Sequence, residues 1–160
     1  MVKECDTTSV GVIVRDSEGR FALLKRACFP IGIAPAAGHI DEHGSPEQAA
    51  REEVHEELGI MLGDLRKTTI YERRVENACR RPGGDHHTWY IYEATAADST
   101  LKPDTEETKG ANWYDGEQLH KLAARTRRST RAKFRKKTGR QTRGLRKFGC
   151  RSWKNWATYH

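Results

Sequence analysis

The sequence predicts an α/β domain, because strand-like and helical segments alternate along its first 128 residues. Two β-rich runs, 7–15 and 20–26, flank the turn-like segment 16–19 and are typical of a hairpin. A short helix is predicted at 46–58, and a strand rich in aromatic and β-branched residues at 86–95. At 160 residues the chain is expected to form about one domain.

The helix at 46–58 has well-defined ends. Ser45 is a favoured N-cap, Pro46 suits the first helical position, Gln48 completes a capping box, and Gly59 ends the helix. At about 100° per residue the helix has an apolar arc that can face a core, made of Ala50, Val54 and Leu58.

Three carboxylates lie beside that apolar arc. Glu53, Glu56 and Glu57 cover an arc of roughly 100°, and like charges at these spacings repel one another. A hard divalent cation, Mg²⁺ or Mn²⁺, would neutralise them. The spacing alone fits a solvated acidic helix face equally well.

The segment 38–60, GHIDEHGSPEQAAREEVHEELGI, resembles the Nudix box, G-x5-E-x7-R-E-U-x-E-E-x-G-U with U an aliphatic residue. The positions in register are Gly38, Glu53, Val54, Glu56, Glu57, Gly59 and Ile60. Two positions depart from it: Gly44 replaces the first glutamate, and Glu52 replaces the arginine, with Arg51 one residue early. We expect these departures to weaken or alter metal binding, unless Asp41, Glu42 or Glu52 compensates.

The resemblance implies a Nudix-type α/β/α sandwich with a mixed curved sheet and the Nudix loop-helix. It implies a Mg²⁺-dependent (or Mn²⁺-dependent) pyrophosphohydrolase that acts on a nucleoside diphosphate linked to another moiety, with water attacking phosphorus. Glu53, Glu56 and Glu57 would bind the metal, with Glu53 and Glu57 catalytic. Gly38 and Arg26 are the substrate-binding candidates, and Lys25 could also contact phosphates; solvated charges at a strand end are the alternative for the two basic residues.

The segments after the helix complete the predicted sheet. A strand is expected at 67–76, and in the next one His86 and His87 are interpreted as strand-surface residues rather than metal ligands. Residues 89–92 alternate between two faces, one for the core and one that can offer a base-stacking surface. The last predicted strand is 111–114.

An acidic loop, 96–110, precedes that last strand. By resemblance, Glu106 or Glu107 is a candidate for an additional base or metal ligand. Asp115 is expected to cap a final helix that begins at Gly116.

We divide the chain into a Nudix domain, 1–128, and a basic C-terminal tail, 129–160. Residues 121–160 hold 15 of the 29 Lys and Arg and none of the 22 Asp and Glu, which leaves 14 basic against 22 acidic side chains before them. Three interpretations of the tail are open: a segment that binds RNA through basic and aromatic side chains, a disordered solubilising segment, and a non-native sequence. The third rests on residues 132–139, whose codons can be chosen so that a shifted frame reads Glu-Ile-Ser-Glu-Glu-Asp-Trp.

The sequence has no leader and no apolar run long enough to span a bilayer, so we expect a cytoplasmic protein with no membrane partner. The oligomeric state is left open, with a homodimer as one possibility. The four scattered cysteines fit reduced, mostly buried thiols better than disulfides or a zinc site. Two alternative functions remain. One is a non-catalytic Nudix-like module that binds nucleotide or RNA, and the other is an enzyme like isopentenyl-diphosphate isomerase, whose reactive cysteine and extra metal-binding histidines have no evident counterparts here.

Overall fold

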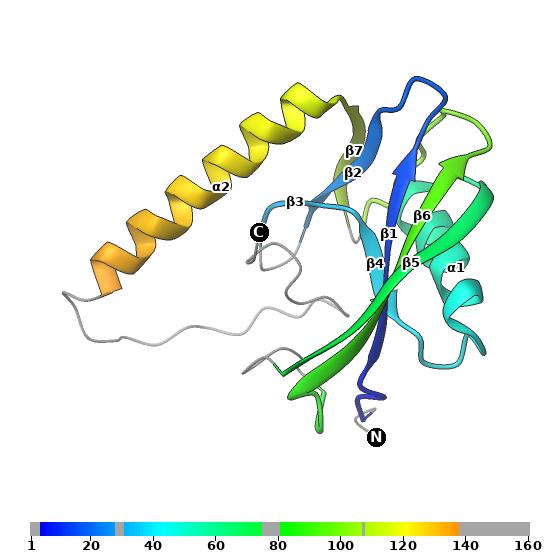
Figure 1. The fold of residues 1–160 in the computed structure, drawn as a ribbon, viewed down its shortest axis with the longest axis horizontal. Coiled ribbons are helices and arrows are strands. Elements are labelled where there is room, and N and C mark those ends of the chain that lie inside the picture. The colour runs from blue at the N-terminus through cyan, green and yellow to red at the C-terminus, as the bar shows by residue number, and fades with distance from the viewer. Residues whose placement is uncertain (1–3, 28–30, 75–80, 107, 138–160) are drawn as a thin grey trace.

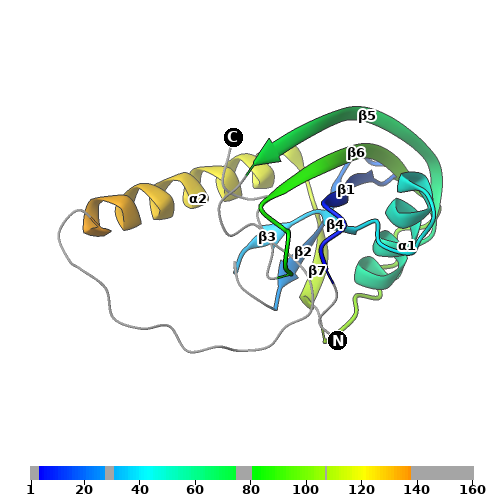
Figure 2. The same ribbon diagram turned by 90° about the horizontal axis from the view of Figure 1, so that it is seen from below.

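The computed structural model describes residues 4–27, 31–74, 81–106 and 108–137. They form a seven-stranded mixed sheet with two helices, one packed against the sheet and one extending away from it, as Figures 1 and 2 show, so the predicted fold class is confirmed. The strands are β1 (Thr8–Arg15), β2 (Phe21–Arg26), β3 (Ile33–Ala34), β4 (Ala36–His39), β5 (Leu62–Arg74), β6 (His86–Ala96) and β7 (Thr108–Tyr114), and the helices are α1 (Pro46–Leu58) and α2 (Gly116–Lys137).

Strand β1 lies at the centre of the sheet. It pairs parallel with β6 over its full length and antiparallel with β4, while β5 continues the sheet beyond β6. The predicted hairpin of β1 and β2 is present, and Arg15 pairs with Phe21 next to its turn. The Asp16 carboxylate closes that turn by accepting hydrogen bonds from the Arg20 backbone, the Arg20 side chain and the Glu18 backbone.

Helix α1 covers one face of the sheet with the predicted apolar arc. Ala50, Val54 and Leu58 are fully buried, and they pack with β1 residues such as Val12 and with Tyr92 of β6. Burial of a large aliphatic side chain contributes about 1.5–3 kcal/mol, so this face holds the helix on the sheet.

Residues 89–92 are divided between two cores, because successive strand residues face opposite sides. Tyr92 is buried in the main core and Tyr90 packs against it, whereas Trp89 and Ile91 form a second buried cluster with Ala37. Since Trp89 is only 7% exposed, the predicted base-stacking surface has little ring area to offer.

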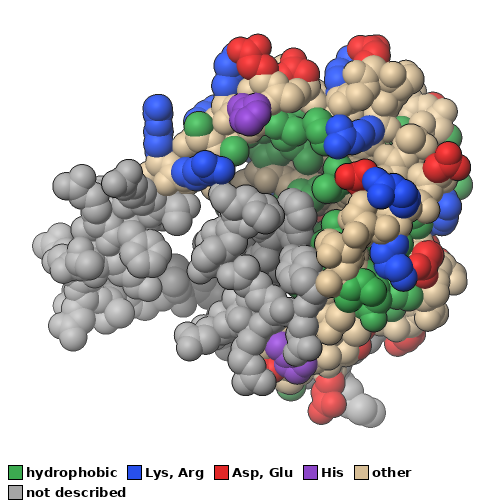
Figure 3. Space-filling view, in the orientation of Figure 1, with side chains coloured by type: hydrophobic (Ala, Val, Ile, Leu, Met, Phe, Trp, Pro, Cys, Tyr) green, Lys and Arg blue, Asp and Glu red, His purple; other side chains and the backbone are tan. Residues whose placement is uncertain are grey.

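Helix α2 leaves the end of β7 and extends away from the sheet, with Lys and Arg side chains along it in Figure 3. Asp115 caps it as predicted: its carboxylate accepts from the Gln118 backbone, and the Gln118 side chain accepts from the Asp115 backbone. The proposed boundary at 128–129 falls within α2 and stays a prediction, and residues 138–160 of the tail lie outside the described residues.

Neither helix in the described ranges is long and apolar enough to cross a membrane. The cytoplasmic location stays a prediction.

Candidate active site

The loop before α1 and the helix itself form the predicted loop-helix unit. The Ser45 hydroxyl accepts a hydrogen bond from the Gln48 backbone at 3.2 Å, and Gly59 ends the helix in the left-handed conformation, with φ of +67°. The reciprocal half of the capping box is absent, because the Ser45 backbone N–H donates to the His43 carbonyl at 3.1 Å, while the Gln48 side chain donates to Glu52. These local contacts fix the first and last residues of α1, and thereby the face of the helix on which its glutamate side chains lie.

Glu53 lies against the backbone of β4. Its carboxylate occupies the space beside Gly38: an added Cβ at that glycine would be 2.5 Å from Glu53 Oε2 and closer still to Oε1 and Cδ. Glu53 is 9% exposed. Glycine at this position therefore leaves the space that the Glu53 carboxylate occupies, and a Cβ would displace that carboxylate.

Glu57, one turn further along α1, is also attached to β4. Its Oε2 accepts a hydrogen bond from the Ala37 backbone at 3.0 Å, and the residue is only 3% exposed. The buried Arg26 guanidinium of β2 interacts electrostatically with Glu57: burial lowers the pKa of Arg26, and the Glu57 charge acts in the opposite direction. Buried carboxylates are costly without such partners, so the Ala37 hydrogen bond and the positive charge of Arg26 both stabilise Glu57 inside the fold.

Glu56 is exposed, on the solvent side of the two buried glutamates. The carboxylate oxygens of Glu53, Glu56 and Glu57 do not all lie within 4.8 Å of one another. In the described part of the chain, the only group of three such potential metal ligands is Cys5, His39 and His87. The helix thus supplies two fixed carboxylates and a third that is exposed to solvent.

The two residues that depart from the Nudix pattern, Gly44 and Glu52, have defined places in the structure. Gly44 has a φ of +84°, a conformation that favours glycine, so a glutamate there would strain the loop. Glu52 accepts from the Gln48 side chain and contacts His43. The hydrogen bond from Gln48 lowers the pKa of Glu52, and His43 acts in the same direction.

Arg51 does not replace the missing arginine. Its guanidinium donates to the backbone carbonyls of Leu62 and Gly63, at 3.2 and 3.3 Å, so it ties α1 to the start of β5.

The remaining candidates lie around this unit. Asp41 pairs with Arg81 at 2.7 Å, Glu42 and Lys25 are exposed, and Glu106 is exposed in the loop before β7. The loop that carries Glu106 leads to Thr108, and Thr108 pairs with Arg26 of β2. The end of this loop therefore lies close to Arg26. Glu107 lies outside the described residues.

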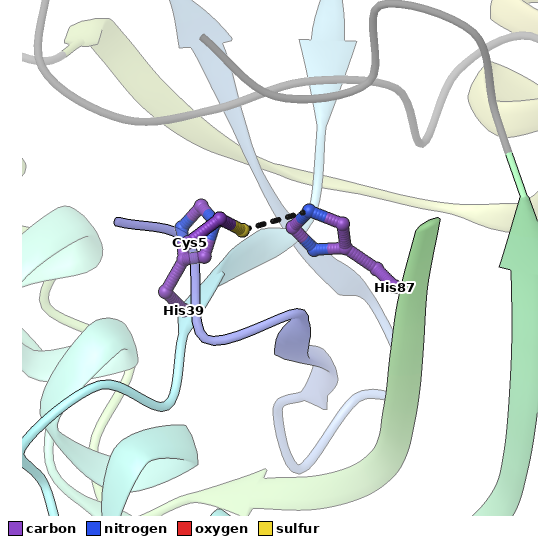
Figure 4. Close-up of side chains that lie close together, drawn as sticks. All are labelled: Cys5, His39 and His87. Carbon is purple, nitrogen blue, oxygen red and sulfur yellow. Dashed lines mark hydrogen bonds between the residues drawn. The ribbon is translucent and has the colours of Figure 1, made fainter. Parts of the chain in front are cut away.

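One interpretation from the sequence is wrong. His87 is 6% exposed and is not a strand-surface residue, since it lies with His39 and Cys5 in a part-buried cluster (Figure 4). Burial lowers the pKa of His39 to about 4 and that of His87 below its usual value, so both imidazoles are neutral at pH 7. His86 is half-buried and pairs with Asp85.

Sequence reasoning missed this cluster because its members are separated by 34 and 48 residues and carry no spacing motif. The pairing of β1 with both β4 and β6 brings them together.

Comparisons with known proteins identify the family and the fold. The family model described as NUDIX domain matches residues 6–135. A similar solved structure is the dihydroneopterin triphosphate pyrophosphohydrolase of E. coli, with 20% identity, coverage of 76% of this chain and 86% of that chain, and a TM-score of 0.62. The Ap4A hydrolase of C. elegans, in a binary complex, has 19% identity, coverage of 81% and 97%, and a TM-score of 0.52.

A third similar structure is the NUDIX domain of Shewanella oneidensis NrtR in complex with ADP ribose, with 12% identity, coverage of 76% and 79%, and a TM-score of 0.61. At these identities the three structures establish a shared fold.

Proposed function

This chain is a member of the NUDIX hydrolase family, and we propose that it is a Mg²⁺-dependent pyrophosphohydrolase of a nucleoside diphosphate linked to another moiety. The observation that carries the proposal is the attachment of two helix carboxylates to one strand, Glu53 beside Gly38 and Glu57 on the Ala37 backbone. One similar structure is a dihydroneopterin triphosphate pyrophosphohydrolase and another is an Ap4A hydrolase; both names support hydrolysis of a phosphoanhydride, and the second supports a nucleotide substrate.

The residues present fit a hard divalent cation. Glu53, Glu56 and Glu57 offer carboxylate oxygens, the ligands that Mg²⁺ and Mn²⁺ prefer, and Gly38 leaves no side chain between the strand and the Glu53 carboxylate. When bound, the metal would neutralise the diphosphate, polarise its phosphoryl oxygens and lower the pKa of the attacking water.

The chain itself positions these groups. The Ala37 backbone hydrogen bond fixes the Glu57 side chain, and the Arg26 guanidinium balances its charge. Because Arg26 is only 5% exposed, we assign it to positioning Glu57 more than to direct phosphate contact. Glu53 is held against Gly38, where it can act as ligand or base, and Glu106 or Glu107 is a further candidate base from the neighbouring loop.

Metal-dependent turnover tests the proposal. A panel of nucleoside triphosphates, nucleotide sugars, dinucleotides and isopentenyl diphosphate is incubated with and without Mg²⁺, and product release is measured. We expect Mg²⁺-dependent hydrolysis that falls by at least about 100-fold in Glu53→Gln and in Glu57→Gln, because each change removes a charged ligand or base. Full activity in both variants would rule out this site.

The matched control is Glu52→Gln. It makes the same chemical change one residue away, on a side chain that contacts His43 and Gln48. We expect it to keep most of the activity, and a loss as large as that of Glu53→Gln would instead show that Glu52 has joined the metal site.

A binding module without turnover is the second candidate function. Two charged positions of the Nudix pattern are absent, and Gly44 adopts a conformation that disfavours the missing glutamate. No product release from any substrate of the panel, together with saturable nucleotide binding, would favour this function. RNA binding by the tail, the isomerase-like activity and homodimer formation stay predictions.

A further inference from the structure

Cys5, His39 and His87 come together from three separate segments. Cys5 precedes β1, His39 ends β4 and His87 is near the start of β6 (Figure 4). Backbone hydrogen bonds hold the Cys5 segment in place, from Cys5 to Pro82 at 2.9 Å and from Thr88 to Thr7 at 2.8 Å. The three side chains are therefore held in place by the sheet.

The two distances from sulfur to nitrogen are those of a zinc site, and all three donor atoms lie within 4.8 Å of one another. Cys5 Sγ lies 3.6 Å from His39 Nε2 and 3.4 Å from His87 Nε2. With Zn–S of about 2.3 Å and Zn–N of about 2.0–2.1 Å, a tetrahedral angle separates sulfur from nitrogen by about 3.5–3.6 Å. We propose that Cys5, His39 and His87 bind one Zn²⁺ through Sγ and the two Nε2 atoms.

Neighbouring groups orient these ligands. Ser9 Oγ lies 2.7 Å from His87 Nδ1, which leaves His87 Nε2 directed at Cys5 Sγ. Such a partner on the second ring nitrogen is usual for a metal-bound histidine. The Thr7 backbone N–H points to Cys5 Sγ at 3.4 Å, a contact that stabilises the thiolate formed when the thiol proton passes to solvent.

This site differs from the carboxylate site in chemistry and in place. Thiolate and imidazole select zinc over magnesium, whereas the glutamates of α1 select hard cations. His39 follows Gly38 in β4 and therefore faces the other side of the strand. On that side lie Ser9 and, next to His87, the Trp89 ring, 6.3 Å away between ring centroids.

Three protein ligands leave the fourth position of the zinc for water or an exogenous ligand. The bound ion would link the segment before β1 to β4 and β6, which would make the N-terminal segment part of the fold. The readout of the test is metal binding and thermal stability, so its outcome does not depend on the proposed hydrolase activity.

The experiment titrates the metal-free full chain with Zn²⁺ against a chromophoric chelator, with excess Mg²⁺ present to occupy carboxylates. We expect one Zn²⁺ per chain and a higher midpoint of thermal unfolding. Cys5→Ser and His87→Gln should lower the zinc affinity by more than about 100-fold, and Ser9→Ala by about 10–100-fold. His86→Gln, the same change at the neighbouring position, should bind as the wild type does.

Co²⁺ substitution identifies the thiolate even if a variant fails to fold. The wild type should show a thiolate-to-cobalt charge-transfer band, and the triple variant Cys28→Ser, Cys79→Ser, Cys150→Ser should retain it, because Cys5 is then the only remaining cysteine. Absence of the band in the wild type or in a triple variant that circular dichroism shows to be folded, or a Zn²⁺ affinity unchanged in both Cys5→Ser and His87→Gln, would overturn the proposal.

Discussion

Gly38→Ala separates the function of the Gly38–Glu53 contact from its contribution to stability. The new Cβ would lie 2.5 Å from Glu53 Oε2 and closer to Oε1, whereas a carbon and an oxygen pack without strain at about 3.5 Å. The carboxylate must therefore retreat by more than about 1 Å. Because it is the far end of a flexible side chain, and alanine is compatible with the strand backbone of β4, stability should change by less than about 1 kcal/mol.

The effect on catalysis should be much larger. A misplacement of about 1 Å in a catalytic group can cost about 100-fold in rate, which corresponds to about 2.7 kcal/mol in the activation barrier. The assay compares kcat/KM, Mn²⁺ affinity and urea unfolding of Gly38→Ala with those of Gly116→Ala, where an added Cβ meets no atom within 4 Å. Wild-type kcat/KM in Gly38→Ala would refute the argument that Glu53 acts from its position against β4.

Two further predictions concern stability. Gly59→Ala should destabilise the chain by at least about 1–2 kcal/mol, because the residue has φ of +67° and its Cβ would lie 2.7 Å from the Lys102 carbonyl carbon. Urea unfolding measures this loss, and an unchanged midpoint would contradict it. For Asp16→Asn the loss should depend on pH. Burial acts to raise the pKa of Asp16, but the hydrogen bonds and charge of Arg20 outweigh it and lower the pKa below 3.8. The carboxylate therefore stabilises the fold fully above that ordinary value and progressively less as the pH falls through its folded pKa, so the stability difference between wild type and Asp16→Asn should shrink between pH 6 and pH 3. A difference that stays constant over this range would contradict the assignment.

The sequence predicted the loop-helix unit well because its determinants are local. The N-cap Ser45, the terminal Gly59 and the apolar arc of α1 act within a few residues of one another, and each is found where the pattern indicates. Strands β1, β2, β5, β6 and β7 were also predictable from β-branched and aromatic runs, although β5 begins at Leu62 rather than at Lys67. The short strands β3 and β4 were not predicted. Composition could not fix that start, which depends on pairing with β6.

What the sequence could not supply depends on long-range pairing. Nothing near Cys5 indicates that the segment before β1 meets the end of β4 and the start of β6. Likewise, Arg26 has the sequence context of an exposed strand end, yet pairing of β2 with β7 buries it near Glu57. Side-chain burial at strand ends follows from the topology, which a single sequence does not specify.

The two departures from the Nudix pattern form one structural unit. Gly44 takes a left-handed conformation within a tight turn in which the His43 backbone donates to Ile40 and the Ser45 backbone donates to His43. That turn places the His43 ring beside Glu52, so an arginine at position 52 would lose the contact that the Glu52 carboxylate makes with the imidazole. Restoring the arginine alone would therefore break the His43 contact, and restoring the glutamate alone would strain the turn. A return to the family pattern requires both positions and the turn to change together.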